Sequence, residues 1–269
     1  GIPELLDELT RCKMPMAILS NKPESFTLLT VDELLGVIKN LLRYKHTISY
    51  TGSSSLEEVV SLLKKHHVIS GLLQDPPPYR FLKARTVDKD EILFVHKDMA
   101  QAHLRIEFGD EEYNEANIPA VQLYNAYFAG GMGGIVFQEL REARALAYSA
   151  GARYLTGSRK GDQNIMVGGI GCQPDKAVEA LEAFKDLLDN LPVEPERFEQ
   201  ARQSVINRYR TSKLGFRQIL GSVRSWEKLS VPIDPRKSRF QHVQDAEIGQ
   251  MLAFHKARLK SRPKLISVV

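Results

Sequence analysis

The stretch that decides the fold runs from Tyr127 to Leu155 and reads YFAGGMGGIVFQELREARALAYSAGARYL. A cluster of four glycines precedes a charged, amphipathic segment, and an extended, strand-like segment follows that. The spacing fits neither the G-x-G-x-x-G turn of a dinucleotide site nor a phosphate loop, which ends in Gly-Lys-Ser/Thr. We therefore interpret the glycines as a tight junction between two helices, where a positive φ or a close backbone approach is required.

The helix predicted after the glycines has two faces. At 100° per residue, the face expected to meet the core holds Val136, Leu140, Ala143 and Ala147. The opposite face holds Gln138, Arg141, Ala145 and Tyr148. Arg141 and Tyr148 are two helical turns apart, so both can point into one cleft. A guanidinium offers a fork of donors for a carbonyl, and a phenol can donate to a developing oxyanion. A surface arginine beside a half-buried tyrosine explains the same spacing.

Strands and helices come in separate groups along the rest of the chain. Patterns of alternating or continuous apolar residues predict strands over 91–98, 101–109, 146–155, 163–172 and 264–269. Helical periodicity predicts helices over 117–128, 173–191, 194–214, 216–230 and 245–259. This grouping is typical of an α+β fold, with an antiparallel or mixed β-sheet and helices packed on one face.

The chain is expected to contain two parts. Residues 1–74 read as a helix–strand–helix unit, with the strand over 46–52, and are too short for a complete domain. We interpret 1–74 as the tail of a preceding α/β subdomain plus a proline-rich linker, and 75–269 as a C-terminal α+β domain. Three consecutive prolines at 76–78 favour an extended segment near this boundary.

Composition excludes a disordered or membrane-spanning chain. Of 269 residues, 43% are hydrophobic and 26% charged, and no apolar run approaches the length of a membrane helix. The net charge is +4, and the stretch Arg197–Lys264 holds sixteen Lys/Arg against five Asp/Glu. Such a surplus could attract nucleic acid. Because no aromatic residues are interleaved and no reading motif is present, solvated helix faces are the favoured interpretation.

No complete catalytic set is present in the sequence. None of the seven histidines forms HExxH or HxxEH, and G-x-S-x-G is missing. His96 and His103 flank a predicted turn and are only a weak metal candidate. Glu139 and Glu142 alternate with arginines. Salt bridges on a helix surface explain this pattern without a catalytic role for the two carboxylates. The two cysteines indicate no disulfide framework.

The combined pattern resembles the pitrilysin/insulinase family of zinc peptidases, specifically their C-terminal half, which binds no metal. The family has a glycine-rich turn followed by roughly S-x-L-F-Q-E-x-R-E-x-x-G-L-A-Y-S, which the quoted stretch matches without gaps. KDMAQAHLRI before it and GIGCQPDKAVEALEAF after it are similar to the family's neighbouring elements. The resemblance runs from about Leu28 to the C-terminus and is closest to bacterial members.

The resemblance implies a clam-like peptidase built from two homologous α+β halves. The N-terminal half carries HxxEH and a distal glutamate, which bind zinc and activate water, and the C-terminal half closes over the substrate. By the family's pattern, Arg141 would hold a substrate carbonyl and Tyr148 would donate to the tetrahedral oxyanion. Gln138, on the same predicted helix face, is a further candidate for substrate binding. Ala145 stands where the family has glycine, which favours a helix that simply continues.

The leading hypothesis is a substrate-binding, catalytically incomplete half of a zinc metalloendopeptidase that completes an HxxEH-bearing N-terminal half. No cofactor is expected in this chain, and zinc is expected in the partner half. The expected partners are that half, on the same or a separate chain, and a peptide substrate, without nucleic acid or membrane. The alternative is a non-catalytic assembly or processing-complex subunit of the same fold. The sequence does not assign a cellular compartment, and the bacterial periplasm or cell envelope is the candidate location.

Overall fold

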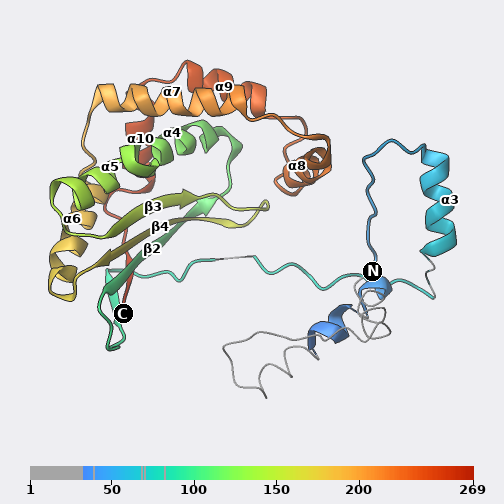
Figure 1. Cartoon of the computed structure of the whole chain (residues 1–269), viewed down its shortest axis with the longest axis horizontal. Coiled ribbons are helices and arrows are strands. Elements are labelled where there is room, and N and C mark those ends of the chain that lie inside the picture. The colour runs from blue at the N-terminus through green and yellow to red at the C-terminus, as the bar shows by residue number, and fades with distance from the viewer. Residues whose placement is uncertain (1–32, 39, 68, 70, 82) are drawn as a thin grey trace. The chain divides into compact units, whose positions relative to one another are not determined.

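The computed structural model describes residues 33–38, 40–67, 69, 71–81 and 83–269 (Figure 1). The chain divides into two units, Gly1–Tyr79 and Arg80–Val269. The division falls just after the run of prolines, a few residues beyond the boundary expected at 74/75. The interpretation of 1–74 as the tail of a preceding subdomain stays a prediction, and its first 32 residues lie outside the described part of the chain.

Among the described residues of the first unit, α3 (Leu56–His66) is a helix with a capped N-terminus. The Ser55 hydroxyl accepts a hydrogen bond from the Glu58 amide, and the Glu58 carboxylate accepts one from the Ser55 amide, which together form a capping box. Residues 46–52 form no strand, so that expectation was wrong. Next to this segment, Tyr44 forms a single parallel bridge with Gln74. One bridge does not provide enough hydrogen bonds to stabilise a strand.

The second unit is built on a mixed five-stranded sheet with the order β1-β5-β2-β4-β3. The strands are β1 (Glu91–Phe94), β2 (Ala102–Glu112), β3 (Ser149–Leu155), β4 (Gln163–Cys172) and β5 (Leu265–Val268). β1 and β5 are parallel, whereas β2 pairs antiparallel with both β5 and β4, and β4 pairs antiparallel with β3. β3 and β1 are therefore the two edge strands.

Apart from α8 (Phe216–Lys228), which lies next to the β3–β4 turn, the helices of this unit lie on one side of the sheet, in two layers (Figure 1). They are α4 (Ile118–Ala129), α5 (Ile135–Phe137), α6 (Ala177–Asp189), α7 (Pro195–Thr211), α9 (Arg236–Gln244) and α10 (Ile248–Arg258). α4, α5 and α6 contact the sheet, and α7, α9 and α10 contact α4. The predicted α+β class is confirmed. No helix among the described residues is long and apolar enough to cross a lipid bilayer.

Alternation along β2 explains why only one face of the sheet is covered. Leu104 and Ile106 are buried, whereas the alternate residues His103 and Arg105 are exposed. On β4, a Cβ added to Gly168 would lie 2.3 Å from the ring of Phe184 in α6. The glycine-rich strand thus lets α6 pack directly on the sheet.

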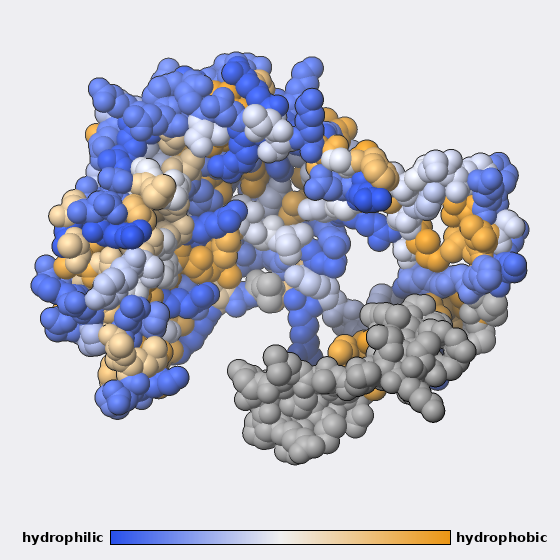
Figure 2. Space-filling view, in the orientation of Figure 1, coloured by the Kyte–Doolittle hydropathy of each residue, from blue (hydrophilic) through white to orange (hydrophobic). Residues whose placement is uncertain are grey.

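The outer surface of α7 and α9 is mainly hydrophilic (Figure 2). Most basic residues of α7 and α9 extend into solvent or form ion pairs on this surface. Arg202 pairs with Glu199, and Arg236 pairs with Asp234. Arg239 of α9 instead turns inward. Its guanidinium donates to the Glu115 carboxylate at 2.6 Å and to the Tyr113 hydroxyl at 3.0 Å, which ties α9 to the segment before α4.

Candidate functional site

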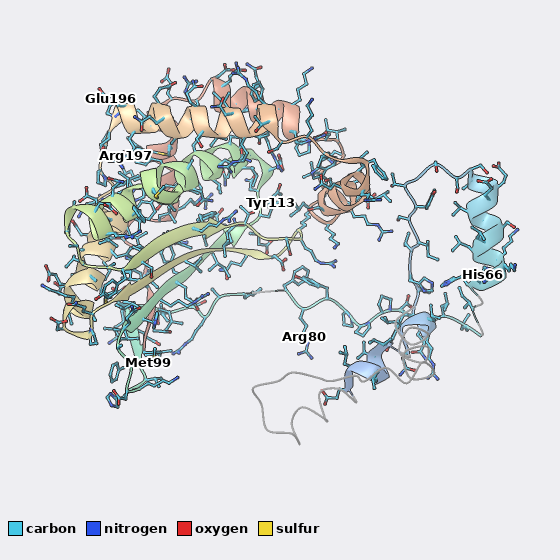
Figure 3. All side chains as sticks on the ribbon, viewed as in Figure 1. His66, Arg80, Met99, Tyr113, Glu196 and Arg197 are labelled. Atoms are coloured by element: carbon cyan, nitrogen blue, oxygen red, sulfur yellow. The ribbon has the colours of Figure 1, made fainter. Side chains whose placement is uncertain are left out.

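The glycine cluster joins α4 to α5 by a single turn of 3-10 helix, Gly131–Gly133. Gly131 has φ +62°, and a Cβ on Gly134 would lie 2.6 Å from the amide nitrogen of Gly130. Arg197, at the start of α7, donates to the Gly133 carbonyl at 2.9 Å and holds the turn in place (Figure 3). The predicted tight helix-to-helix junction is confirmed, because both a positive φ and a close backbone approach are present.

The helix after this turn is shorter than the sequence predicts. α5 passes into a π-helical segment, η4 (Gln138–Ala143), and Ala145 then adopts φ +51°. The amide of Leu146 donates to the Leu140 carbonyl at 2.9 Å, which closes the helix around this residue. The expectation of a continuing helix was therefore wrong: Ala145 takes the backbone conformation for which glycine is best suited.

The change from α- to π-helix also alters which side chains are buried. Val136, Leu140 and Ala147 lie in the core as predicted. Ala143 is exposed, and Leu146 is buried instead. A π-helical turn contains an extra residue compared with an α-helical turn, so the side chains after it point in different directions from those that a 100° step predicts.

Arg141 and Tyr148 nevertheless line the same hollow, which has a volume of about 340 Å³. Arg141 enters it from the end of η4, and Tyr148 from the residue just before β3. The remaining lining residues are Glu142, Ala145, Leu146, Ala147, Gln173 and Lys176. The two side chains come together because the chain turns at Ala145, and not because they are two turns apart on one helix.

The Tyr148 side chain is positioned as a hydrogen-bond donor. Its hydroxyl accepts a hydrogen bond from Nε2 of Gln173 at 3.1 Å, and the tyrosine is 53% exposed. A phenol that accepts through its oxygen keeps its own proton free for another acceptor. That proton can reach a ligand in the hollow.

The Arg141 guanidinium is held only loosely. It lies over the Phe137 ring, 4.8 Å from the centroid, and its Nε is 3.8 Å from the Glu142 carboxylate. An exposed pair at that distance contributes little, so the fork of donors stays available. Lys176 adds positive charge, because a hydrogen bond to Glu179 raises the pKa of its ammonium group. The same hydrogen bond leaves the ammonium group less available to a ligand.

Gln138 lies elsewhere. Its side-chain amide donates to the Met132 carbonyl at 2.5 Å, and it does not line the hollow. Gln173 and Lys176, in contrast, were not singled out in the sequence. They lie in the turn between β4 and α6, where the segment QPDK reads simply as the start of a helix.

Arg141 and Tyr148 offer hydrogen-bond donors rather than a reacting group. A phenol and a guanidinium can bind a carbonyl oxygen or an oxyanion, but neither can activate water or serve as a metal ligand set. Among the residues that the structure describes, no group of three or more His, Cys, Asp or Glu is placed to hold a metal ion. The geometry therefore supports binding of a polarised oxygen.

A family model described as the peptidase M16 inactive domain matches residues 28–205 of the chain. The chain belongs to the M16 inactive-domain family. This match, which covers the glycine turn, Arg141 and Tyr148, confirms the resemblance to the non-zinc-binding half of pitrilysin/insulinase-type peptidases. No curated protein matches the chain.

Solved structures show the same M16 fold at low identity. A peptidase M16 inactive domain from Pseudomonas fluorescens is 15% identical, with a TM-score of 0.63 over 80% of this chain and 50% of that one. A protease from Helicobacter pylori is 13% identical, with a TM-score of 0.63 over 81% and 53%. A chain of complex III from Candida albicans is 12% identical, with a TM-score of 0.54 over 81% and 53%. This M16 chain thus spans about half the length of these relatives.

Proposed function

We propose that this chain is the substrate-binding, catalytically incomplete half of a zinc metalloendopeptidase, and that an HxxEH-bearing half supplies zinc and the activated water. The observation that carries the proposal is the hollow in which Arg141 and Tyr148 meet. Arg141 holds a carbonyl of the bound peptide, and Tyr148 donates to the tetrahedral oxyanion that forms when water attacks. The match to the M16 inactive-domain family and the coverage of about half the length of the relatives support a chain that works together with a second half.

The test is peptide cleavage by the chain combined with its zinc-bearing half. Replacing Arg141 with alanine removes one charge-assisted hydrogen bond, so kcat/KM should fall at least about tenfold. Tyr148→Phe should lower kcat more than it changes KM, because the phenol acts on the transition state. Arg144→Ala is the matched control, since Arg144 is exposed, lies near Glu139 and does not line the hollow.

Unchanged cleavage by both site variants would remove the hollow from the mechanism. The chain by itself is expected to bind no stoichiometric zinc and to cleave no peptide. Stoichiometric zinc with chelator-sensitive cleavage would contradict the division of labour between the two halves. A role for Gln138 in substrate binding would act through the glycine turn, because its amide is bonded to Met132.

A second candidate function is that of a non-catalytic subunit of an assembly or processing complex. The fold similarity to a chain of complex III favours it. In this case the chain forms a stable hetero-oligomer, and the function of that assembly survives Tyr148→Phe. The same variant therefore distinguishes the two candidates.

A further inference from the structure

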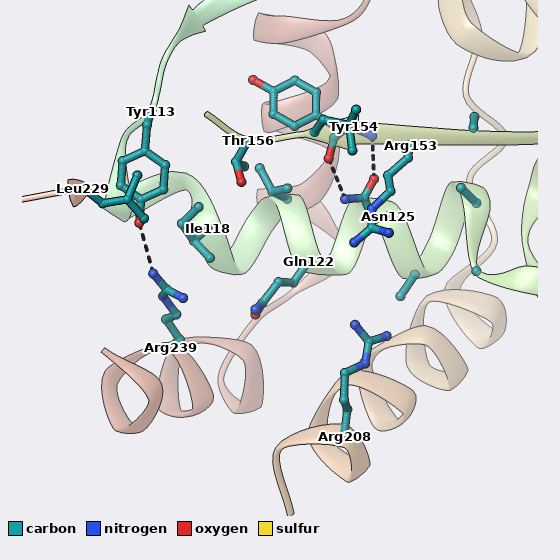
Figure 4. Close-up of a pocket in the computed structure, with 16 residues that line it drawn as sticks. Tyr113, Ile118, Gln122, Asn125, Arg153, Tyr154, Thr156, Arg208, Leu229 and Arg239 are labelled. Atoms are coloured by element: carbon teal, nitrogen blue, oxygen red, sulfur yellow. Dashed lines mark hydrogen bonds between the residues drawn. The ribbon is translucent and has the colours of Figure 1, made fainter. Parts of the chain in front are cut away.

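A larger concavity lies along the free edge of the sheet, apart from the Arg141/Tyr148 hollow. This pocket of about 560 Å³ is bounded by β3, α4, α7 and α9 (Figure 4). We call it the β3 groove. Its floor is formed by small and polar side chains of α4, among them Gln122, Asn125 and Ala126. At one end it reaches Gly130, the first residue of the glycine turn.

The β3 groove carries uncompensated positive charge. Its lining includes Arg153, Arg208 and Arg239, and no carboxylate among the described residues lines it. Arg239 is paired with Glu115. Arg153 and Arg208 have no ion pair within the described part of the chain, and they extend from β3 and α7 toward the same part of the groove (Figure 4). Two adjacent guanidinium groups without a carboxylate favour an anionic ligand.

The backbone of β3 offers a second kind of contact. The Tyr154 amide donates to Oδ1 of Asn125 at 2.8 Å, and its carbonyl accepts from Nδ2 at 2.9 Å. Tyr154 therefore turns both backbone groups away from β4. Ala152, two residues earlier on the same edge, has the same orientation, because hydrogen-bonded and non-bonded positions alternate along a strand. It also lines the groove, so an extended chain can pair with it.

The positive charge continues beyond the groove. A neighbouring pocket of about 670 Å³ shares Gln122, Arg208 and Arg239 with it. This second pocket is further lined by Arg210, Arg236 and Lys237, with Asp234 as the acidic residue in the described lining. A single small anion would fill only part of the two adjoining pockets. A chain with several negative groups fits them better.

We propose that the β3 groove binds an extended peptide segment rich in Asp and Glu. The peptide backbone pairs with Ala152, and its carboxylates engage Arg153 and Arg208. β3 begins directly after Tyr148, and Arg153 lies five residues further on, about 16 Å along an extended chain. A peptide held at the hollow and running along β3 would carry its acidic residues about five positions from the bound carbonyl. That this peptide is a substrate rests on the proposed function, whereas its binding does not require the zinc half.

The test is fluorescence anisotropy on the whole chain without the zinc half. The probes are a labelled ten-residue peptide with alternating Glu, the same peptide with Gln for Glu, and a labelled single-stranded RNA of ten nucleotides. The double variant R153Q/R208Q removes the two unpaired arginines. The control R217Q/K256Q removes the same charge at exposed positions outside the groove. Ala152→Pro removes the outward-facing N–H while leaving the charge unchanged, and Pro is tolerated at a strand edge.

The Glu peptide should bind at least tenfold more tightly than the Gln peptide, and the affinity should fall as salt rises. R153Q/R208Q should weaken binding of the Glu peptide at least tenfold, the control less than twofold, and Ala152→Pro several-fold. Thermal melting of each variant confirms that it is folded. Equal binding of the Gln peptide, an unaffected R153Q/R208Q variant, or tighter binding of the RNA would each overturn the proposal. Because binding is measured without cleavage, its outcome is separate from that of the proposed function.

Discussion

Ala145 adopts a left-handed backbone conformation, which costs an L-residue roughly 1–2 kcal/mol. Glycine adopts this conformation without that cost but loses more entropy on folding. We expect Ala145→Gly to leave stability unchanged or raise it by up to about 1 kcal/mol. Ala145→Val should lower stability by more than about 1 kcal/mol, since β-branched residues tolerate φ > 0 poorly. Urea unfolding of both variants measures this, and a stabilising Val would contradict the reading of the backbone.

At the scale of residues, the sequence predicts that two side chains lie close together, but not the backbone path that brings them there. Arg141 and Tyr148 were predicted to meet, and they line one hollow. The route was wrong, because hydrophobic periodicity assumes a constant 100° step and contains no signal for a π-helical turn. Gln173 could not be found, since it enters from a distant turn that only the tertiary fold brings beside Tyr148.

At the scale of elements, the glycine turn is defined by backbone contact. A Cβ at position 134 would meet the Gly130 amide at 2.6 Å, whereas a Cβ at position 133 would meet nothing within 4 Å. Gly134→Ala should therefore destabilise the protein by about 1–3 kcal/mol, because main-chain atoms must move. Gly133→Ala is the matched control and should change stability by less than about 0.5 kcal/mol. Equal melting temperatures for the two variants would show that the turn can relax at no cost.

Elements with strong periodicity were predicted, and weakly patterned ones were missed. The alternation along β2 and the apolar stripe of α6 identify both elements in the sequence. α9 was not predicted, since it is short, mostly polar and begins just after Pro235. The strand expected over 46–52 has the right composition, but no strand among the described residues pairs with it, and strand formation depends on pairing rather than on propensity alone.

At the scale of the whole molecule, His255 links the pH of the solution to stability. It is 5% exposed, and its Nε2 lies 2.7 Å from the Leu188 carbonyl at the end of α6. Burial lowers the pKa of His255 below its usual 6.5, so the unfolded chain takes up a proton before the folded chain does. Stability is then fully present above pH 6.5 and falls as the pH drops below that value.

This predicts a loss of stability between pH 7.5 and pH 5.5. The slope from this one group can reach about 1.4 kcal/mol per pH unit. His255→Gln keeps a donor for the Leu188 carbonyl but does not titrate, so its unfolding free energy should depend less on pH over this range. Urea titrations at several pH values compare the two proteins. Parallel pH profiles would show that other groups control acid stability.

The pairing of β1 with β5 brings the first and last strands of the second unit side by side at one sheet edge. Their contact closes a loop that contains almost the whole domain, so its entropic cost is high and it should form late in folding. The same proximity makes the domain suited to circular permutation. Because β1 and β5 are parallel, the end of β5 and the start of β1 lie at opposite ends of the strand pair, so the joining linker must run back along the strands and needs about a dozen residues. A new opening in the turn between β3 and β4 would then leave every strand pair intact.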